Sequence, residues 1–275
     1  MKTKGIFLFL TVCFLAVCSE EIKSQSALPA DFKMETYINQ FDENGTFPNG
    51  TAGWSYWFFA PGVTDTLSIK TSRIFLSKAS HAPHTHPADE AFYILQGPVR
   101  VHINGEERIL QTGDIYYCPS YSSHNISRVG EDPIQYYIMT RETKGENRAY
   151  PVGKENYTMD DCIYYPNNDP AWTNGGKLAT VKALDKNFSG GMRIVMHRVT
   201  SEDANYSTRE PYTAEQEVFY VISGEADVML DGQTAHIQSN TAFWCPNGTR
   251  RSVVQTGNEP LVYLQCTTRN YNPSN

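Results

Sequence analysis

The sequence predicts an all-β protein composed of two similar halves, and three observations support this. Short apolar stretches recur along the chain and are separated by turns rich in Gly, Pro, Asn and Asp, with no long helical pattern between them. Val99, Val101 and Ile103 alternate with polar residues, as in a half-buried strand. In addition, the second half repeats the first. Regular short strands of this kind are typical of β-sandwiches and barrels.

Ten segments are expected to be strands, because they combine β-branched or aromatic residues with flanking turn signals. In the first half they are Arg73–Ser77, Ala91–Leu95, Val99–Ile103, Ile115–Tyr117 and Ile134–Met139. In the second half they are Arg193–Val199, Val218–Ile222, Ala226–Leu230, Ala242–Trp244 and Leu261–Cys266. Turns are expected between strands, as at Asn104-Gly105 and Asp231-Gly232.

The two halves match each other at a constant spacing. The segment EAFYILQG, which begins at Glu90, matches EVFYVISG, which begins at Glu217. The dipeptide at Cys118 matches the one at Cys245, so both pairs are 127 residues apart (217 minus 90, and 245 minus 118). A register without gaps over this distance is unlike chance similarity between strands. It indicates two homologous domains in one chain.

We therefore expect an N-terminal domain over 28–140, a polar linker over 141–160 and a C-terminal domain over 161–270. The chain has 275 residues, and its 40% hydrophobic content provides for a packed core. The formal net charge of −7 argues against nucleic acid as a partner, which requires a cationic surface. Beyond the N-terminus, no apolar stretch is long enough to span a bilayer, so we expect no internal membrane span.

Residues 1–19 have the pattern of a secretory signal peptide. Lys2 and Lys4 precede an apolar run from Ile6 to Cys18, which is too short to cross a membrane. A lipoprotein anchored through Cys18 is the alternative, but Val17 fits that signal poorly. We therefore expect a secreted, extracellular protein.

An excess of N-glycosylation sequons supports a eukaryotic secretory route. The motif Asn-x-Ser/Thr occurs at seven positions, and we expect glycans at some of them: Asn44, Asn49, Asn125, Asn156, Asn187, Asn205 and Asn247. Asn125 directly follows His124, so on a strand its side chain should point away from any site that contains His124. A glycan on Asn125 is therefore expected to leave such a site open.

Four cysteines remain after removal of the signal peptide. They are Cys118, Cys162, Cys245 and Cys266. An oxidising compartment permits disulfides, but four cysteines allow three pairings and the sequence does not choose among them. Their spacing does not resemble a zinc knuckle, and they are too sparse to form a disulfide scaffold.

A cluster of metal-ligating residue types lies in the first half of the chain. His84 and His86 are two residues apart, so on a strand both imidazoles project to the same side. A turn over 87–89 would let Glu90 begin the next strand and add a carboxylate, with Asp89 as the competing candidate. His124 supplies a third imidazole. Three imidazoles and one carboxylate suit one divalent transition metal per chain, with Fe, Mn, Ni, Cu and Zn all compatible.

These residues resemble the two motifs of the cupin superfamily. The pattern is His84-x-His86-x3-Glu90-x6-Gly97, followed by Gly113-Asp114-x4-Pro119-x4-His124. The resemblance implies a small antiparallel barrel of jelly-roll type with the metal in its mouth. The internal repeat then implies a bicupin, with two tandem jelly-roll (cupin) β-barrels. In one chain these mimic a cupin dimer, which is compatible with a monomer, although the sequence leaves the oligomeric state open.

The second copy lacks the ligand set. At the same offset of 127, Pro211 stands for His84, Thr213 for His86 and Arg251 for His124, while Glu217 is retained. Proline offers no ligand atom and arginine keeps its proton, so we expect no metal there. A buried carboxylate needs a partner. We therefore expect Arg251 to pair with Glu217 in place of the missing cation.

Secretion, two cupin domains and a metal site only in the first resemble secreted quercetin 2,3-dioxygenases. That resemblance implies that Glu90 both ligates the metal and takes a proton from the substrate. The chain departs from this family in its length and in having three residues between His86 and Glu90, where many members have four. The sequence therefore favours a dioxygenase acting on a small aromatic or flavonol-like substrate. The alternatives are a cupin decarboxylase or sugar-acid isomerase, or a non-catalytic binding or matrix protein.

Overall fold

The structure, a computed structural model, describes residues 28, 31–49, 53–64, 66–75, 82–142, 157–200, 206–208 and 215–269. Almost all the regular structure in these residues is antiparallel β-sheet, arranged in four sheets. The expected signal peptide at 1–19 lies outside the described residues. The helices within them are short: η1 (Met34–Thr36), η2 (Glu43–Gly45), η3 (Met159–Cys162), η4 (Pro166–Asn168), α1 (Pro170–Thr173) and α2 (Lys186–Ser189).

The N-terminal barrel consists of a seven-stranded and a three-stranded sheet. The larger has the order β11-β8-β5-β10-β4-β3-β2, and the smaller has the order β7-β6-β9. Their strands are β2 (Phe47–Pro48), β3 (Gly53–Phe59), β4 (Leu67–Ile74), β5 (Ala88–Gln96), β6 (Val99–Ile103), β7 (Glu106–Leu110), β8 (Ile115–Cys118), β9 (His124–Arg128), β10 (Ile134–Glu142) and β11 (Ile163–Tyr164).

The C-terminal barrel has the same plan, with a six-stranded and a four-stranded sheet. Their orders are β1-β18-β15-β20-β13-β12 and β14-β19-β16-β17. The strands are β1 (Ile38–Gln40), β12 (Leu178–Leu184), β13 (Met192–Val199), β14 (Tyr206–Thr208), β15 (Glu215–Ser223), β16 (Glu225–Leu230), β17 (Gln233–Gln238), β18 (Thr241–Cys245), β19 (Arg251–Gln255) and β20 (Leu261–Arg269).

All ten expected strands coincide at least in part with observed ones, and the all-β prediction is confirmed. The expected strand Arg73–Ser77 is misplaced, because β4 begins at Leu67 and ends at Ile74. The earlier part of β4 is rich in Ser and Thr, which hides the apolar alternation. The expected turn over 87–89 is also wrong: β5 begins at Ala88, since its pairing with β10 extends to Glu142.

The internal repeat is visible in the strand register. Glu90 of β5 lies opposite Cys118 of β8, and Glu217 of β15 lies opposite Cys245 of β18. Hairpin turns also repeat, since Asn104 and Asp231 both adopt positive φ values, of 48° and 43°, and each precedes a glycine. Such left-handed residues match the twist of two-residue hairpins. The two barrels therefore share one topology.

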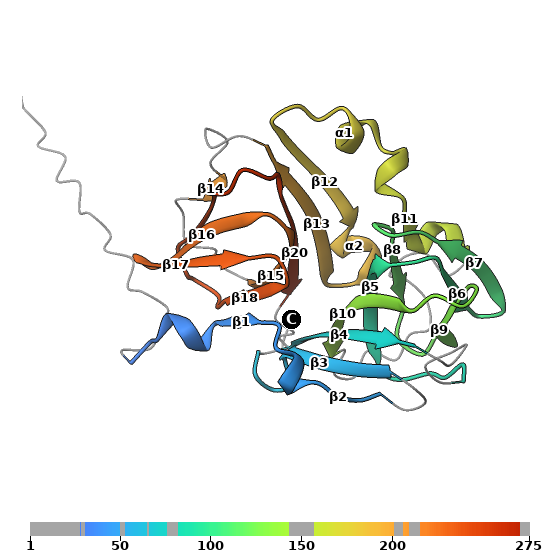
Figure 1. Ribbon diagram of the computed structural model, residues 1–275. Coiled ribbons are helices and arrows are strands. Elements are labelled where there is room, and N and C mark those ends of the chain that lie inside the picture. The colour runs from blue at the N-terminus through green and yellow to red at the C-terminus, as the bar shows by residue number, and fades with distance from the viewer. Residues whose placement is uncertain are drawn as a thin grey trace, which may run out of the picture.

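Two short strands are exchanged between the barrels. β1, which precedes all the strands of the N-terminal barrel, pairs with β18 of the C-terminal barrel. β11, which follows the N-terminal barrel in sequence, pairs back onto β8. In Figure 1, β1 lies against the C-terminal barrel although the chain then continues into the N-terminal one. The expected N-terminal domain (28–140) includes β1, and the expected C-terminal domain (161–270) includes β11. The pairing of these two strands therefore crosses both expected domain limits. Of the expected linker, 143–156 lies outside the described residues.

The barrels also pack against each other. The rings of Tyr137 on β10 and Tyr220 on β15 stack with their centroids 4.0 Å apart and an interplanar angle of 18°. The amide of Gln216 donates to the hydroxyl of Thr66 at 3.0 Å, and both residues are buried. Apolar stacking and satisfied polar groups together join the two sheets into one interface.

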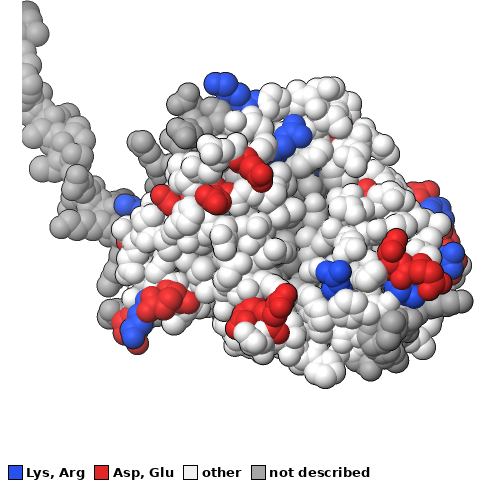
Figure 2. All heavy atoms as spheres, viewed as in Figure 1, with Lys and Arg blue, Asp and Glu red and all other residues white. Residues whose placement is uncertain are grey.

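Charged residues of both signs are interspersed on the face shown in Figure 2. Separately, none of the helices in the described part of the chain is long and apolar enough to cross a bilayer. Each of the two α-helices has four residues.

Candidate metal centre

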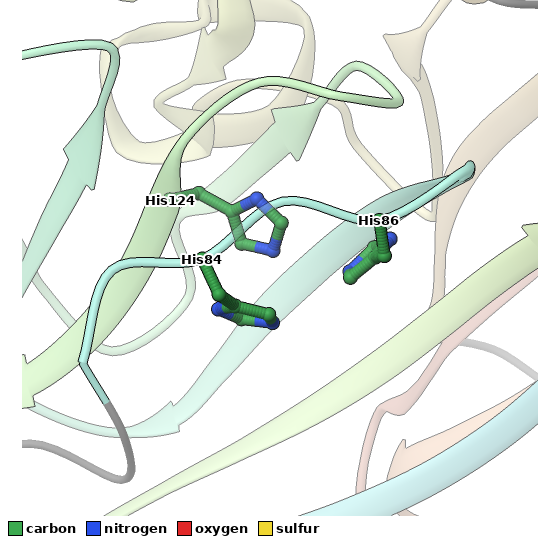
Figure 3. Close-up of side chains that lie close together, drawn as sticks. All are labelled: His84, His86 and His124. Carbon is green, nitrogen blue, oxygen red and sulfur yellow. The ribbon is translucent and has the colours of Figure 1, made fainter.

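Three imidazoles converge at one end of the N-terminal barrel, as expected from the sequence. His84, His86 and His124 each place a ring nitrogen within 4.8 Å of the others. The ring centroids of His84 and His86 lie 4.7 Å and 4.8 Å from that of His124. Figure 3 shows the three rings grouped between the segment that carries His84 and His86 and the strand that carries His124.

Backbone hydrogen bonds hold the two segments in this arrangement. The amide of His84 donates to the carbonyl of His124 at 3.2 Å, and the amide of His124 donates back to the carbonyl of His84 at 3.0 Å. Two residues on, the amide of Tyr121 donates to the carbonyl of His86 at 2.8 Å. The extended His84–His86 segment is therefore bound to the residues around His124. This pairing explains why residues 38 positions apart meet (124 minus 86).

The protonation state of His124 suits a metal ligand. Its Nδ1 lies 2.8 Å from the carbonyl oxygen of Ser122, which can only accept a hydrogen bond, so Nδ1 carries the proton. Nε2 then presents a lone pair toward the other two rings. This buried atom has no hydrogen bond of good geometry. A histidine whose second nitrogen is bound to a carbonyl is the usual form of a metal-ligating imidazole. The donor set therefore fits a divalent transition metal.

Glu90 lies beside the three histidines. Its Oε2 is 3.3 Å from Nε2 of His124 and 3.5 Å from Nε2 of His86, while its Oε1 accepts a hydrogen bond from the Thr140 hydroxyl at 3.2 Å. Burial opposes ionisation of Glu90, but the interactions with His124 and His86 outweigh it and hold the pKa of this carboxyl well below its usual range. The same contact with Glu90 raises the pKa of His86 against the effect of burial.

The neighbouring carboxylate, Asp89, points to the opposite side of β5. It is fully buried and forms an ion pair with Arg141, whose Nε donates to Asp89 Oδ2 at 3.1 Å. The amide of Ser120 donates to Asp89 Oδ1 at 2.9 Å. Because successive residues of a strand face opposite ways, only Glu90 can face the histidines. Of the two carboxylates, Glu90 is the one placed beside the imidazoles.

The four side chains line a cavity of about 290 Å³ in the N-terminal barrel. The sequence did not indicate the other polar members of its wall. These are Asn49, Lys70, Ser72, Asn125 and Tyr136. Lys70 and Ser72 lie on β4, in the part of that strand that the sequence patterning missed. No pattern in the sequence marks them, because the Ser and Thr residues of β4 hide its alternation.

The cavity wall also differs from expectation at Asn125. This residue lies between His124 and Ile126 on β9, is partly buried and contributes to the lining. His124 and Ile126, its neighbours on β9, line the same cavity. The sequon at Asn125 therefore adjoins the cavity and does not lie remote from it. Asn49, another sequon, lines the same cavity.

Aromatic residues form only part of the cavity. Of the rings near the motifs, Phe92 lines it and stacks on Tyr116, with centroids 4.5 Å apart. Tyr116 itself is fully buried, and Tyr117 donates from its hydroxyl to the carbonyl of Ser189 in the other barrel at 3.1 Å. Tyr117 therefore belongs to the barrel interface. Most of these rings build the core.

In the C-terminal barrel, Arg251 occupies the position equivalent to His124. Arg251 forms a buried ion pair with Glu217, as the sequence predicted. The other oxygen of Glu217 accepts a hydrogen bond from the Gln265 amide at 2.8 Å. Pro211 and Thr213, which replace the two remaining histidines, lie outside the described residues. The Arg251 guanidinium thus neutralises the charge of the retained Glu217 carboxylate.

Comparison with known protein families gives two matches to this chain. The family model described as the cupin domain matches residues 74–140 and again residues 201–266. Both halves of this chain are cupin domains. The matched stretches include Glu90 and Glu217 with their surrounding strands, as the internal repeat requires. No curated protein sequence matches the chain.

Solved bicupin structures share the fold at low sequence identity. A variant of oxalate decarboxylase from Bacillus subtilis matches with a TM-score of 0.65 and 18% identity, covering 90% of this chain and 80% of that one. Oxalate decarboxylase from Lactobacillus farciminis gives 0.64 and 12%, covering 86% of each chain. A variant of salicylate 1,2-dioxygenase from Pseudoaminobacter salicylatoxidans gives 0.61 and 14%, covering 81% and 76%. These similarities establish the bicupin fold.

Proposed function

We propose that this bicupin is a secreted metal-dependent oxidoreductase, specifically a dioxygenase that acts on a small aromatic substrate. The observation that carries the proposal is the convergence of His84, His86 and His124, with the Nε2 lone pair of His124 directed into the group. With Nδ1 of His124 bonded to Ser122, its Nε2 has the Glu90 carboxylate 3.3 Å away, and a bound cation would satisfy both groups.

The three histidines would hold one divalent transition metal. When bound, such an ion supplies Lewis-acid and redox chemistry to a substrate oxygen or to dioxygen. Glu90 stands beside the imidazoles, where its carboxylate can complete the ligand set or accept a proton from a substrate hydroxyl. Thr140 orients the second carboxylate oxygen through its hydrogen bond. The partly enclosed barrel limits the access of water.

The size of the cavity favours a small substrate. Its volume of about 290 Å³ lies just below the roughly 300–1,000 Å³ that is usual for small-molecule sites. A single-ring compound suits this space better than a three-ring flavonol does. We therefore use the resemblance to quercetin 2,3-dioxygenases for the ligand pattern only. For the substrate we propose an aromatic compound smaller than a flavonol.

A cupin decarboxylase is the second candidate, favoured by the similarity to oxalate decarboxylase structures. Such bicupins usually keep metal in both domains. Here Arg251 occupies the equivalent of the His124 position in the second barrel. The loss of that ligand counts against an oxalate-type decarboxylase and favours the dioxygenase. A non-catalytic binding or matrix protein is the third possibility, which a turnover assay separates from the other two.

Secretion and glycosylation are part of the proposal. Asn44 and Asn187 are exposed, so oligosaccharyl transfer would meet no packing obstacle at these sequons. Asn49, Asn125 and Asn247 are partly buried, whereas Asn156 and Asn205 lie outside the described residues. We propose a small-molecule substrate, no nucleic-acid partner and a chain that acts as a monomer.

Metal analysis of the protein from its native source tests the proposal, combined with oxygen uptake on a panel of small phenols and aromatic acids. We expect one metal equivalent per chain and oxygen consumption that His86→Ala abolishes. His236→Ala, an exposed histidine of the second barrel, is the matched control and should retain both. Two equivalents per chain would contradict the assignment. Carbon dioxide release from oxalate without oxygen uptake would favour the decarboxylase, and a full metal content without any turnover would favour a binding protein.

A further inference from the structure

A lysine lies in the wall of the metal cavity opposite the histidines. Lys70 of β4 is directly opposite Ile138 of β10, and Ile138 is opposite Phe92 of β5. Residues paired across antiparallel strands project to the same face of the sheet. All three residues line the cavity. Lys70 is therefore directed into the same space as Glu90, which lies two residues from Phe92 on β5.

The spacing leaves room for a small molecule between the lysine and the metal ligands. Two strand separations place the backbone of Lys70 roughly 10 Å from that of β5. The ammonium group lies 5.1 Å from the ring centroid of Trp57, on the side of β4 away from β5. A cation–π contact thus holds the charge against the far wall of the barrel. His124 lies on β9 of the other sheet and His84 is bridged to it, whereas Glu90 projects from the same sheet as Lys70, two strands away.

The charge of Lys70 is not neutralised within the described part of the protein. No carboxylate there lies within 4.0 Å of its ammonium group, although many other basic residues have such partners, such as Arg108 with Asp160 at 2.8 Å. The neighbouring cavity residues Ser72 and Asn49 are uncharged. An ammonium with only an aromatic ring for support, next to neutral hydrogen-bonding groups, is suited to an anionic ligand.

We infer that Lys70 is a specificity-determining residue that binds the carboxylate of the substrate, so that the substrate class is a small aromatic acid. This inference rests on the proposed function and adds the substrate charge to it. The ring would lie along Phe92 and Ile138, with the carboxylate at Lys70 and the oxygen-bearing end at the histidines. With a divalent ion in place, Glu90 offsets one of its two charges and Lys70 adds another, so the cavity as a whole attracts an anion.

The test compares binding of benzoate with binding of benzamide, which has the same shape without the charge. Calorimetric titration uses the full chain loaded with Zn²⁺, so that no turnover occurs and metal content is measured on the same sample. The matched variants are Lys70→Met, Lys70→Arg and, as the control, Lys177→Met, which changes an exposed lysine of the C-terminal barrel. Thermal unfolding of each variant verifies that the fold is intact.

We expect wild type to prefer benzoate, and Lys70→Met to reduce that preference at least about tenfold, because a charge-assisted hydrogen bond is lost. Affinity for benzamide should change little. Lys70→Arg should restore most of the preference, and Lys177→Met should equal wild type. The contribution of the metal to the preference is common to all variants and cancels in the comparison.

An unchanged preference in Lys70→Met would overturn the inference, as would a zinc-loaded wild type that binds neither probe or binds both equally. These results would not contradict the assignment of the metal site, because zinc content is determined separately. Failure of the protein to bind zinc at all would instead contradict the proposed function. The two failures are therefore distinguishable.

Discussion

Arg251 and Glu217 form a buried ion pair in the second barrel at the place where the first barrel has metal-ligating groups. Arg251 lies opposite Leu230 in the β16–β19 pairing, just as His124 lies opposite Ile103 in the β6–β9 pairing. The side chains of Arg251 and Glu217 are 3% and 1% exposed, so their charges are removed from water. The Arg251 guanidinium thus provides the positive charge that a bound metal ion would provide in the first barrel.

Removal of Arg251 should therefore destabilise the second barrel strongly. Arg251→Met removes the guanidinium that faces the buried Glu217 carboxylate, and breaking such a pair costs about 3–5 kcal/mol. The double variant with Glu217→Gln should recover part of this free energy of unfolding. The exposed Arg250→Met is the control and should change stability by about 0.5 kcal/mol or less. Denaturant unfolding measures all three, and equal effects at Arg250 and Arg251 would disprove the role of the pair.

The adjacent carboxylates Asp89 and Glu90 should respond differently to neutralisation. Glu90→Gln should lower metal affinity at least about tenfold and keep the fold, because it touches the imidazoles. Asp89→Asn should instead cost about 3 kcal/mol or more of stability, because it breaks the buried ion pair with Arg141, and should keep metal binding. Metal titration and thermal unfolding of both variants check this. Loss of metal binding in a folded Asp89→Asn would contradict the assignment.

His197 should make stability depend on pH. It is buried, and burial lowers its pKa to about 4 from the ordinary value of 6.5, although a hydrogen bond to Gln265 opposes the shift. Gln265 donates its amide to Glu217, so its oxygen accepts from Nε2 of His197, and Thr180 donates to Nδ1. The ring is therefore held neutral by partners on both nitrogens.

The direction of the pH dependence of stability follows from the neutral state of the His197 ring. Between pH 6.5 and about 4 the unfolded chain binds a proton at His197 that the folded chain does not, so stability falls as pH falls through this window. The loss amounts to roughly 3 kcal/mol from this residue. His197→Gln should flatten the pH dependence of the unfolding free energy in this range relative to wild type. The same slope in both proteins would show that other groups control it.

A glycan on Asn125 should hinder entry to the metal cavity. Asn125 lines this cavity, so an attached sugar would stand at the mouth of the barrel. In protein made by a glycosylating host, Asn125→Gln should raise the association rate of benzoate several-fold. Asn187→Gln, at an exposed sequon of the C-terminal barrel, is the matched control and should leave it unchanged. Stopped-flow binding measures the rates, with glycan occupancy determined by mass spectrometry.

Much of the site was predictable because its chemistry is local in sequence. His84 and His86 have the spacing that places two rings on one side of an extended segment, and Glu90 has the strand phase that directs it toward them. The constant offset of 127 also predicted the Arg251–Glu217 pair, because homologous positions keep their register. Spacing and register are properties that a sequence records directly.

The sequence by itself determined the strand-rich fold, the duplication and the four residues of the candidate metal centre. Only the tertiary structure decided that β1 and β11 are exchanged between barrels, and that Lys70 shares a cavity with His124. Those features depend on which distant strands become neighbours. Strand pairing is set by the sum of many weak contacts across the sheets, and no short pattern in the chain encodes that sum.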